Sequence, residues 1–333
     1  MIGFEENEIS KNSNGGTELS KRSIAKHIPE ELSSEFQVMA SKVRDLNPEK
    51  IRIYWQHDLP QDPEIVHLKE ESSRCRFHNF VFVSNWQLNE YVKELGFPRD
   101  SKITVIENPI DIFPKVEKSF KKIRLVYFST PHRGLEILVP VFTELAKKYE
   151  NIHLDVYSSF AIYGWPDADK HFEPLYEKIR NHPQMTYHGS VPNDQLRNAI
   201  SESHILAYPS IWQETSCRVL IESMSAGLLC VHPNYAALTE TSGGLTSMYQ
   251  YQDNVQDHAN LFYQYLEHSI NIVQNEETQN YLKFVKAYAD QRFNIDKIAF
   301  QWNNMMQEML GKYPTIESRA IEQPKQMFVY KTT

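Results

Sequence analysis

The chain has 333 residues, which is more than a single hydrophobic core usually sustains, so two domains are expected. Hydrophobic residues make up 41% of the sequence, and no apolar stretch is long enough to span a membrane. The formal net charge of −8 argues against a nucleic-acid partner bound through a broad basic face.

Cysteine usage and the N-terminal sequence both favour the cytoplasm. Cys75, Cys217 and Cys230 are odd in number and scattered, which suits free thiols in a reducing compartment. The first ten residues carry acidic side chains where a secretory signal would carry basic ones before an apolar run. We therefore expect a cytoplasmic protein.

Residues 1–114 are predicted to form an α/β domain. Gly15 and Gly16 make an early loop whose backbone can approach a ligand closely, although a simple turn would also explain the pair. Helices are predicted over 17–27 and 87–95, and short buried strands over 51–56, 80–83 and 103–106. This alternation is typical of a parallel sheet.

His57 follows the predicted strand at 51–56. A histidine at the carboxyl end of a strand is placed to face a cleft, and its neutral ring can both donate and accept hydrogen bonds. The side chain could therefore contact a substrate. A hydrogen bond between domains is the alternative.

Residues 115–122 are predicted to link the two domains. Pro109 and Pro114 flank the turn before them, and four lysines make the segment basic and solvated. A phosphate contact or a peripheral contact with a membrane surface is the alternative function of these lysines.

Residues 123–310 are predicted to form a second α/β domain, and residues 311–333 a polar tail. The predicted strands are 123–128, 152–157, 185–188 and 205–208, and the predicted helices are 135–149, 172–180, 193–202 and, in the last third, 254–310.

Glu214 and Glu222 lie eight residues apart across the start of a helix predicted to begin at Ser216 or Cys217. Unpaired N–H groups at Thr215, Ser216 and Cys217 would suit a diphosphate, because a helix N-terminus carries partial positive charge. The two glutamates could then accept hydrogen bonds from hydroxyl groups on either side of it. The alternative is that both are ordinary helix residues, although Glu222 lies in an apolar run.

Ser129 begins a loop that leaves a predicted strand and opens a helix, where parallel sheets bind ligands. Arg133 is the cation of this loop, and a guanidinium group can bind two phosphate oxygens at once. Arg218 could add a second cation or could be an exposed neighbour of the glutamates.

These residues together resemble a known family. Glu214 and Glu222, with Pro209, Ser210, Met224 and Gly227, resemble the Glu-x7-Glu signature of retaining family 4 glycosyltransferases of the GT-B fold. Other segments follow in the family's order: the early glycines, His57-Asp58, and the segments 83–86 (VSNW), 107–111 (ENPID), 129–136 (STPHRGLE), 188–196 (HGSVPNDQL) and 237–240 (ALTE).

The resemblance implies an α/β protein with two Rossmann-like domains whose parallel sheets face a central cleft. The N-terminal domain is expected to be abbreviated, because only four residues precede the polar run at 5–14. The implied reaction moves a sugar from a nucleoside-diphosphate donor to an acceptor hydroxyl group, on a carbohydrate or another molecule. Retention of the anomeric configuration is implied, and no metal or cofactor is expected.

The resemblance also implies a role for each site residue. Arg133, the helix N–H groups and the glycine loop would stabilise the leaving diphosphate, Glu214 would orient the donor sugar and Glu222 the ribose. His57 would contact the sugar or the acceptor. Gly189 and Val191 would border the nucleobase. The family often has another basic residue five positions before Arg133, where Phe128 and Ser129 stand here.

Three other functions stay open. A GT-B epimerase that acts on the nucleotide sugar alone would share the donor site. A non-catalytic subunit that binds nucleotide sugars would fit the missing second cation. A transferase acting on modified nucleic acid is the least favoured, because of the acidic net charge.

Overall fold

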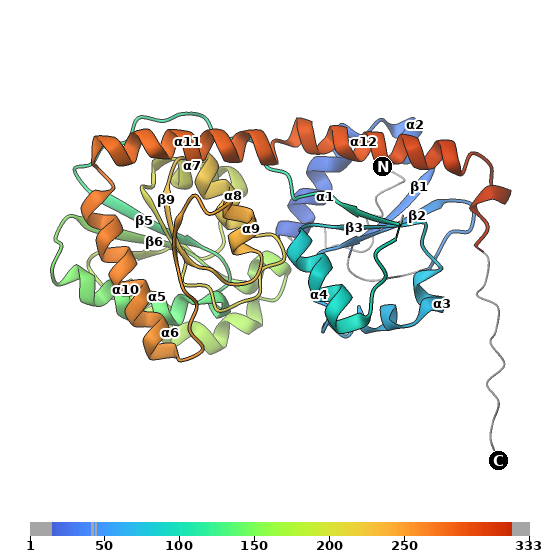
Figure 1. The fold of residues 1–333 in the computed structure, drawn as a ribbon. Coiled ribbons are helices and arrows are strands. Elements are labelled where there is room, and N and C mark those ends of the chain that lie inside the picture. The colour runs from blue at the N-terminus through green and yellow to red at the C-terminus, as the bar shows by residue number, and fades with distance from the viewer. Residues whose placement is uncertain (1–14, 41–42, 44, 101, 322–333) are drawn as a thin grey trace, which may run out of the picture. The chain divides into compact units, whose positions relative to one another are not determined.

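The structure is a computed structural model, and it describes residues 15–40, 43, 45–100 and 102–321. These residues form two compact units. The first unit contains residues 25–106 and 299–321, and the second contains residues 15–24 and 107–298. Each unit has its own parallel sheet, so the predicted α/β class with two Rossmann-like domains is confirmed (Figure 1).

The first unit contains a sheet with the strand order β1-β2-β3-β4, in which all neighbouring strands are parallel. Its strands are β1 (Phe36–Ala40), β2 (Ile51–Gln56), β3 (Asn79–Phe82) and β4 (Ile103–Val105). The first three are buried along their whole length, as expected for a sheet covered on both faces.

Strands β2, β3 and β4 were predicted from the sequence, whereas β1 was not. The five residues of β1 include a glutamine and show no alternation of polar and apolar side chains. The glutamine is Gln37, and its side chain is buried because it binds the backbone of Asp45 and Asn47. A strand of this kind is recognised only once its partners are known.

The helices of the first unit are α2 (Glu30–Ser33), α3 (Glu71–Arg74), α4 (Asn85–Leu95) and most of α12 (Ile295–Lys312), together with the short helices η2 (Val66–Lys69) and η6 (Glu317–Arg319). Helix α1 (Gly16–His27) is divided between the units after Ile24. Helix α4 illustrates the local sequence signals: Ser84 caps its first turn, and Gly96 ends it with a φ of 60°.

The second unit contains a sheet with the strand order β10-β9-β8-β5-β6-β7, again all parallel. Its strands are β5 (Ile123–Phe128), β6 (Ile152–Tyr157), β7 (Met185–Tyr187), β8 (Ile205–Ala207), β9 (Leu229–Pro233) and β10 (Ser247–Tyr249). Numbered from the first of them in the chain, this order is the doubly wound 3-2-1-4-5-6 order of a Rossmann fold.

The helices of the second unit are α5 (Leu135–Ala146), α6 (Glu173–Arg180), α7 (Asn193–Glu202), α8 (Arg218–Ser225), α9 (Leu238–Ser242), α10 (Val255–Ile272) and α11 (Glu276–Phe293). Short helices η3 (Pro131–Arg133), η4 (Phe160–Tyr163) and η5 (Pro166–Phe172) join some of them to the strands. Helices α5, α6 and α10 lie on one side of the sheet, and α8 and α11 on the other (Figure 1).

The division into units differs from the predicted domain ranges at two places. The chain passes from the first unit to the second at residues 106–107, earlier than the predicted link at 115–122. Residues 299–310 were predicted within the second domain and belong to the first unit. The reason is packing, because Trp302 of α12 lies against Trp55 of β2, with ring centroids 4.8 Å apart.

The lysines of segment 115–122 were expected to be solvated, and Lys118 differs from this expectation. Its Nζ atom donates a hydrogen bond to the carbonyl oxygen of Ala226 at 2.9 Å, and burial lowers the pKa of Lys118 to about 8. Lys286 donates to the carbonyl oxygen of Ser225 at 2.6 Å. Both cations lie at the C-terminus of α8, where the helix dipole favours positive charge.

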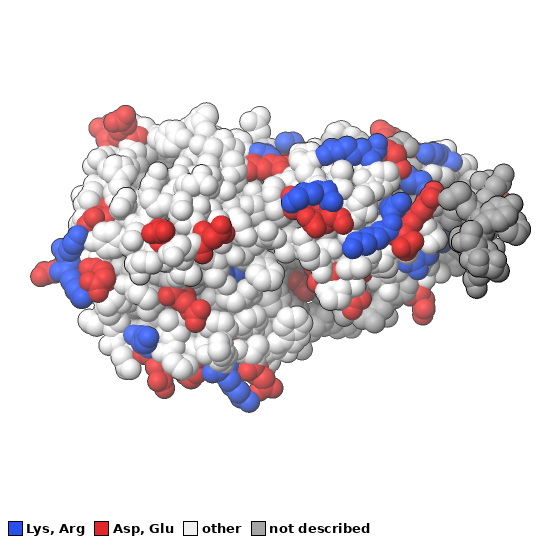
Figure 2. Space-filling model, turned by 60° about the horizontal axis from the view of Figure 1, so that its bottom comes forward, with Lys and Arg blue, Asp and Glu red and all other residues white. Residues whose placement is uncertain are grey.

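The described surface mixes both signs of charge. On the face shown in Figure 2, most lysine and arginine side chains lie beside aspartate or glutamate side chains.

None of the described helices combines the length and the apolar composition needed to cross a lipid bilayer. The segment before Gly15, where the N-terminal domain was expected to be abbreviated, falls outside the described residues.

Candidate active site

Strands β5 and β8 lie side by side at the centre of the second sheet, and the chain continues from them toward opposite edges. This is the topological switch point, where doubly wound sheets bind ligands beyond the carboxyl ends of the strands. The loop after β5 carries Arg133, and the loop after β8 carries Glu214. The fold therefore brings together two residues that are 81 positions apart.

Gly134 allows these two loops to approach each other. Its φ is 117°, a value that side chains rarely tolerate, and a Cβ atom there would lie 2.1 Å from the carbonyl oxygen of Pro209. The glycine is therefore required by the contact between the loops as well as by its own backbone conformation.

The side chains of Arg133 and Glu214 form an ion pair. The Nη1 atom of Arg133 donates to Oε1 of Glu214 at 2.6 Å, and the Glu214 side chain is only 7% exposed. The hydroxyl group of Tyr208 donates to the same oxygen at 2.6 Å. Burial opposes the charge of Arg133, but the adjacent Glu214, together with Tyr163 and Tyr208, holds the pKa of the guanidinium group well above its usual value.

Arg133 also contacts aromatic residues. Its Nη2 atom donates to the hydroxyl group of Tyr163 at 3.4 Å, and its guanidinium carbon lies 5.8 Å from the ring centroid of Trp212. Its buried Nε atom has no hydrogen-bond partner among the described residues. An unsatisfied donor of a buried cation calls for an acceptor, and a phosphate oxygen would provide one.

His132 precedes Arg133 and is neutral at physiological pH. Its ring stacks on Phe160 at 5.2 Å and meets Trp212 edge-on at 4.9 Å. Burial and the charge of Arg133 lower the pKa of His132 to about 4. Arg133 is therefore the permanent cation of this loop.

Glu222 pairs with Arg218 one helical turn earlier in α8. The Nε atom of Arg218 donates to Oε1 of Glu222 at 2.8 Å, and its Nη1 atom donates to the carbonyl oxygen of Pro109 at 2.8 Å. Both side chains are buried. Arg218 was expected to be either a second cation for the ligand or an exposed neighbour of the glutamates. These contacts favour the second role, except that Arg218 is buried.

The early glycine loop lies beside both ion pairs. A Cβ atom on Gly15 would come within 2.6 Å of the Tyr163 ring, and one on Gly16 would lie 4.0 Å from the Cβ atom of Arg218. These residues all belong to the second unit. Because these two residues are glycines, the backbone at 15–16 can pass close to Tyr163, which contacts Arg133, and to Arg218, which contacts Glu222.

Helix α8 begins at Arg218 with Cys217 as its N-cap, close to the predicted start. No side chain caps its first turn. Burial raises the pKa of the Cys217 thiol far above its usual value, so this group remains a neutral thiol. Thr215 and Ser216 are partly exposed just before the helix.

The loop after β9 holds Glu214 from a third side. The N–H group of Ala237 donates to the backbone carbonyl oxygen of Glu214 at 3.0 Å. Ala236 before it has a φ of 51°, a left-handed conformation that is unusual for a residue with a Cβ atom. Strained backbone of this kind is frequent beside functional sites.

Ser129, Gly189 and Val191 follow strands of the same sheet. Ser129 is buried directly after β5, whereas Gly189 and Val191 follow β7 at the edge of the sheet. Gly189 has a φ of 65°, and Val191 packs against the core. In the described part of the chain, none of these three residues forms a hydrogen bond or ion pair with Arg133, Glu214 or Glu222.

His57 belongs to the first unit, where it follows β2. Its ring lies 4.5 Å from the ring centroid of Trp55. The position at the carboxyl end of a strand agrees with the sequence. The role predicted for this side chain stays a prediction.

Two residues of the site were missed by sequence reasoning. Tyr208 binds Glu214, and Tyr163 binds Arg133. The place of Tyr208 directly after a buried strand and before Pro209-Ser210 is a signal that could have indicated it. Tyr163 lies in a short helix after β6 with no comparable signal.

The Asp-x-Asp sequence at Asp167 and Asp169 has structural partners. Asp169 accepts hydrogen bonds from the N–H group of Phe160 and the hydroxyl group of Tyr176, and Asp167 pairs with Lys170. Within the described ranges, no group of three or more His, Cys, Asp or Glu residues could hold a metal ion.

Comparisons with known proteins show what the chain is similar to. Residues 111–258 match the family model of glycosyl transferases group 1, a range that includes Arg133, Glu214 and Glu222. No curated protein is significantly similar to the sequence.

Solved structures share the fold. A glycosyltransferase from Rickettsia africae is 15% identical, with a TM-score of 0.64 over 92% of this chain and 84% of that one. Sucrose-phosphate synthase from Thermosynechococcus elongatus is 14% identical, with a TM-score of 0.62 over 79% of this chain and 68% of that one. HepE from Anabaena, in complex with UDP-glucose, is 17% identical, with a TM-score of 0.55 over 79% and 72%. The chain therefore shares its fold with GT-B glycosyltransferases, and its residues 111–258 are similar to the group 1 glycosyl transferases.

Proposed function

We propose that the protein transfers a sugar from a nucleoside-diphosphate donor to the hydroxyl group of an acceptor, with retention of the anomeric configuration. The observation that carries the proposal is the pair formed by Arg133 and Glu214 at the switch point of the second sheet. A diphosphate needs a cation, and a sugar ring needs a hydrogen-bond acceptor. This pair provides both next to each other.

The leaving diphosphate is where negative charge develops, so groups that favour this charge accelerate the reaction. In the proposed mechanism Arg133 binds the diphosphate, assisted by the N–H groups at the start of α8. Glu214 orients the donor sugar, Glu222 binds the ribose, and Gly189 and Val191 border the nucleobase. His57 contacts the sugar or the acceptor.

Donor binding tests the site directly. Wild-type protein and Glu222→Ala are titrated with UDP-glucose and UDP in a calorimeter, because neighbouring structures of this fold contain these ligands. We expect Glu222→Ala to weaken binding at least tenfold, since a ribose hydroxyl loses a charged partner. Wild-type affinity in this variant would refute the ribose assignment. If neither ligand binds, a panel of other nucleotide sugars in a thermal-shift assay identifies the donor.

Turnover tests the reaction and its stereochemistry. The product of an acceptor screen is examined by NMR, in which the anomeric coupling constant reports retention or inversion. We propose that no metal ion takes part, so turnover is expected to be unchanged after EDTA treatment. Loss of activity with EDTA, followed by recovery with a divalent cation, would contradict this.

A further inference from the structure

Tyr208 is a buried residue that lies directly after β8 and contacts the carboxylate of Glu214. Its side chain is fully buried, and its backbone N–H group donates to the carbonyl oxygen of Val231 at 3.0 Å. Its hydroxyl group donates to Oε1 of Glu214 at 2.6 Å. The backbone and the side chain of Tyr208 are thus both fixed, which gives Glu214 a rigid partner.

Two donors share one oxygen of Glu214. Arg133 and Tyr208 both bind Oε1, each at 2.6 Å. No residue of the described ranges donates a hydrogen bond to Oε2. This second oxygen is therefore the one that can accept a hydrogen bond from a hydroxyl group of a ligand.

The two donors differ in what a nucleotide does to them. A diphosphate competes with Glu214 for the guanidinium group of Arg133, because both are anions. The hydroxyl group of Tyr208 is a neutral donor, and burial together with Glu214 raises its pKa well above the usual value, so it stays protonated. Tyr208 therefore keeps its hydrogen bond to Oε1 when a diphosphate draws Arg133 away.

We propose that Tyr208 is a positioning residue that holds Glu214 in place for the donor sugar while Arg133 binds the diphosphate. This inference rests on the proposed function of the site. It adds that the preference for a nucleotide sugar over the bare nucleotide depends on a tyrosine hydroxyl group that touches neither the nucleotide nor the sugar.

The proposal predicts a selective effect of Tyr208→Phe, which removes the hydroxyl group and keeps the ring. UDP, which lacks the sugar, is expected to bind within twofold of wild type. UDP-glucose is expected to bind about tenfold more weakly, because the Glu214 carboxylate loses the hydrogen bond that holds it in place for the donor sugar. In turnover assays kcat/KM falls by a similar factor.

The matched control is Tyr249→Phe. Tyr249 is also buried, and its hydroxyl group lies 3.0 Å from Nε2 of His258 in a different part of the same unit. Both affinities are expected to stay at wild-type values in this variant. Circular dichroism and the melting temperature verify that the variants are folded.

A double-mutant cycle with Glu214→Gln provides a second measurement. If Tyr208 acts through Glu214, the double variant binds UDP-glucose no more weakly than the weaker of the two single variants. Should Tyr208→Phe fail to fold, Glu214→Gln alone must still reduce the preference for UDP-glucose over UDP, and an unchanged preference overturns the proposal.

Each remaining outcome points to one conclusion. Equal losses of UDP and UDP-glucose affinity in Tyr208→Phe would show a merely structural role and overturn the proposal alone. If the wild-type protein binds UDP-glucose no better than UDP, the same comparison is made with the best donor of the nucleotide-sugar panel and its nucleoside diphosphate. If no nucleotide sugar binds, the proposed function and the role of Tyr208 fail together.

Discussion

Under the proposed function, the ion pair of Arg133 and Glu214 would serve both donor binding and stability. In the structure each neutralises the other in a mostly buried place, and both are the groups that a nucleotide sugar would need. In the proposed mechanism, donor binding would replace the contact between Arg133 and Glu214 with a contact to the ligand. Exchange of this kind limits affinity, because the internal contact is lost when the external one forms.

We expect Arg133→Ala to lower the free energy of unfolding by about 3 kcal/mol, because it leaves the Glu214 carboxylate buried with only one donor. Chemical denaturation measures the effect. In the double variant Arg133→Ala/Glu214→Gln part of this loss is expected to be recovered.

The control for this pair is Lys147→Ala. Lys147 pairs with Glu144 on the surface of α5, where both side chains are more than half exposed. Its loss is expected to change stability by less than about 0.5 kcal/mol. Additive effects of the Arg133 and Glu214 substitutions would contradict the coupling.

Sequence reasoning at the residue scale found the members of this pair but not their arrangement. Glu214, Glu222 and Arg133 were recognised from residue types and spacing. The partners Tyr208 and Tyr163 were missed, because tyrosines beside a strand are ordinary core residues until a contact is seen. The second cation, Arg218, lies against Glu222, which only packing could reveal.

At the scale of elements, the loops after β5 and β8 depend on each other. On the side that faces Pro209, there is no room for a Cβ atom on Gly134. The positions of Arg133 and Glu214 are fixed by these two loops, so a change at Gly134 affects the site without touching either side chain.

We predict that Gly134→Ala destabilises the protein by more than 2 kcal/mol, through steric overlap and an unfavourable φ, and weakens UDP binding. Gly227→Ala is the matched control, because Gly227 also has a positive φ, 69°, but has no atom within 4 Å of the added Cβ. This variant is expected to lose about 1 kcal/mol and to bind UDP normally. Equal effects in the two variants would argue against the overlap.

Most strands and helices were predicted from periodicity within a few residues of their ends. The predicted strand at 123–128 and helix at 193–202 agree with β5 and α7. Helix α12 runs through Gly311, although a stop was expected there, because its apolar side packs on the first unit. Local signals thus gave the type of most elements, and packing set several of their ends.

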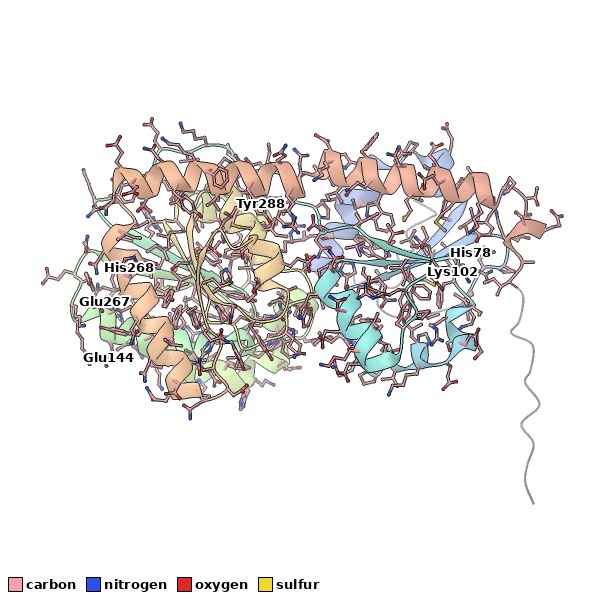
Figure 3. The ribbon with its side chains drawn as sticks, viewed as in Figure 1. His78, Lys102, Glu144, Glu267, His268 and Tyr288 are labelled. Atoms are coloured by element: carbon pink, nitrogen blue, oxygen red, sulfur yellow. The ribbon has the colours of Figure 1, made fainter. Side chains whose placement is uncertain are left out.

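At the scale of the whole molecule, the described chain passes between its two units at residues 24–25, 106–107 and 298–299, and contacts within the second unit join the segments next to the last two of these. Ile110 forms a β-bridge with Asn294, and Arg292 binds Glu107. Arg292 also donates to the hydroxyl group of Tyr288, which Figure 3 labels on α11. Within the second unit, the segment that enters it at residue 107 and the segment that leaves it at residue 298 are therefore joined by backbone and charged contacts.

We expect buried histidines in both units to make the fold sensitive to acid. Burial lowers the pKa of His78 in the first unit and of His204 and His232 in the second to about 4 in each case. His78 is labelled in Figure 3, and its Nδ1 atom accepts a hydrogen bond from the N–H group of Arg52. Protonation would break such contacts.

Because these pKa values are lower in the folded state than in the unfolded chain, the unfolded chain binds more protons between pH 6.5 and 4. Stability is therefore complete above pH 6.5 and falls as the pH decreases, by about 1.4 kcal/mol per pH unit for each histidine. Denaturation midpoints measured from pH 7.5 to 4.5 test this. In His232→Asn the slope is expected to decrease, and an unchanged slope would contradict the assignment.

The sequence by itself determined the α/β class and the order of most elements, and it indicated the candidate site residues. These follow from local periodicity, turn residues and the spacing of charged groups, which depend on neighbours in the chain. Only the tertiary structure decided the strand order that creates the switch point, the return of α12 to the first unit, and the partner of each buried charge. These features depend on contacts between residues far apart in the sequence, and local sequence patterns do not encode such contacts.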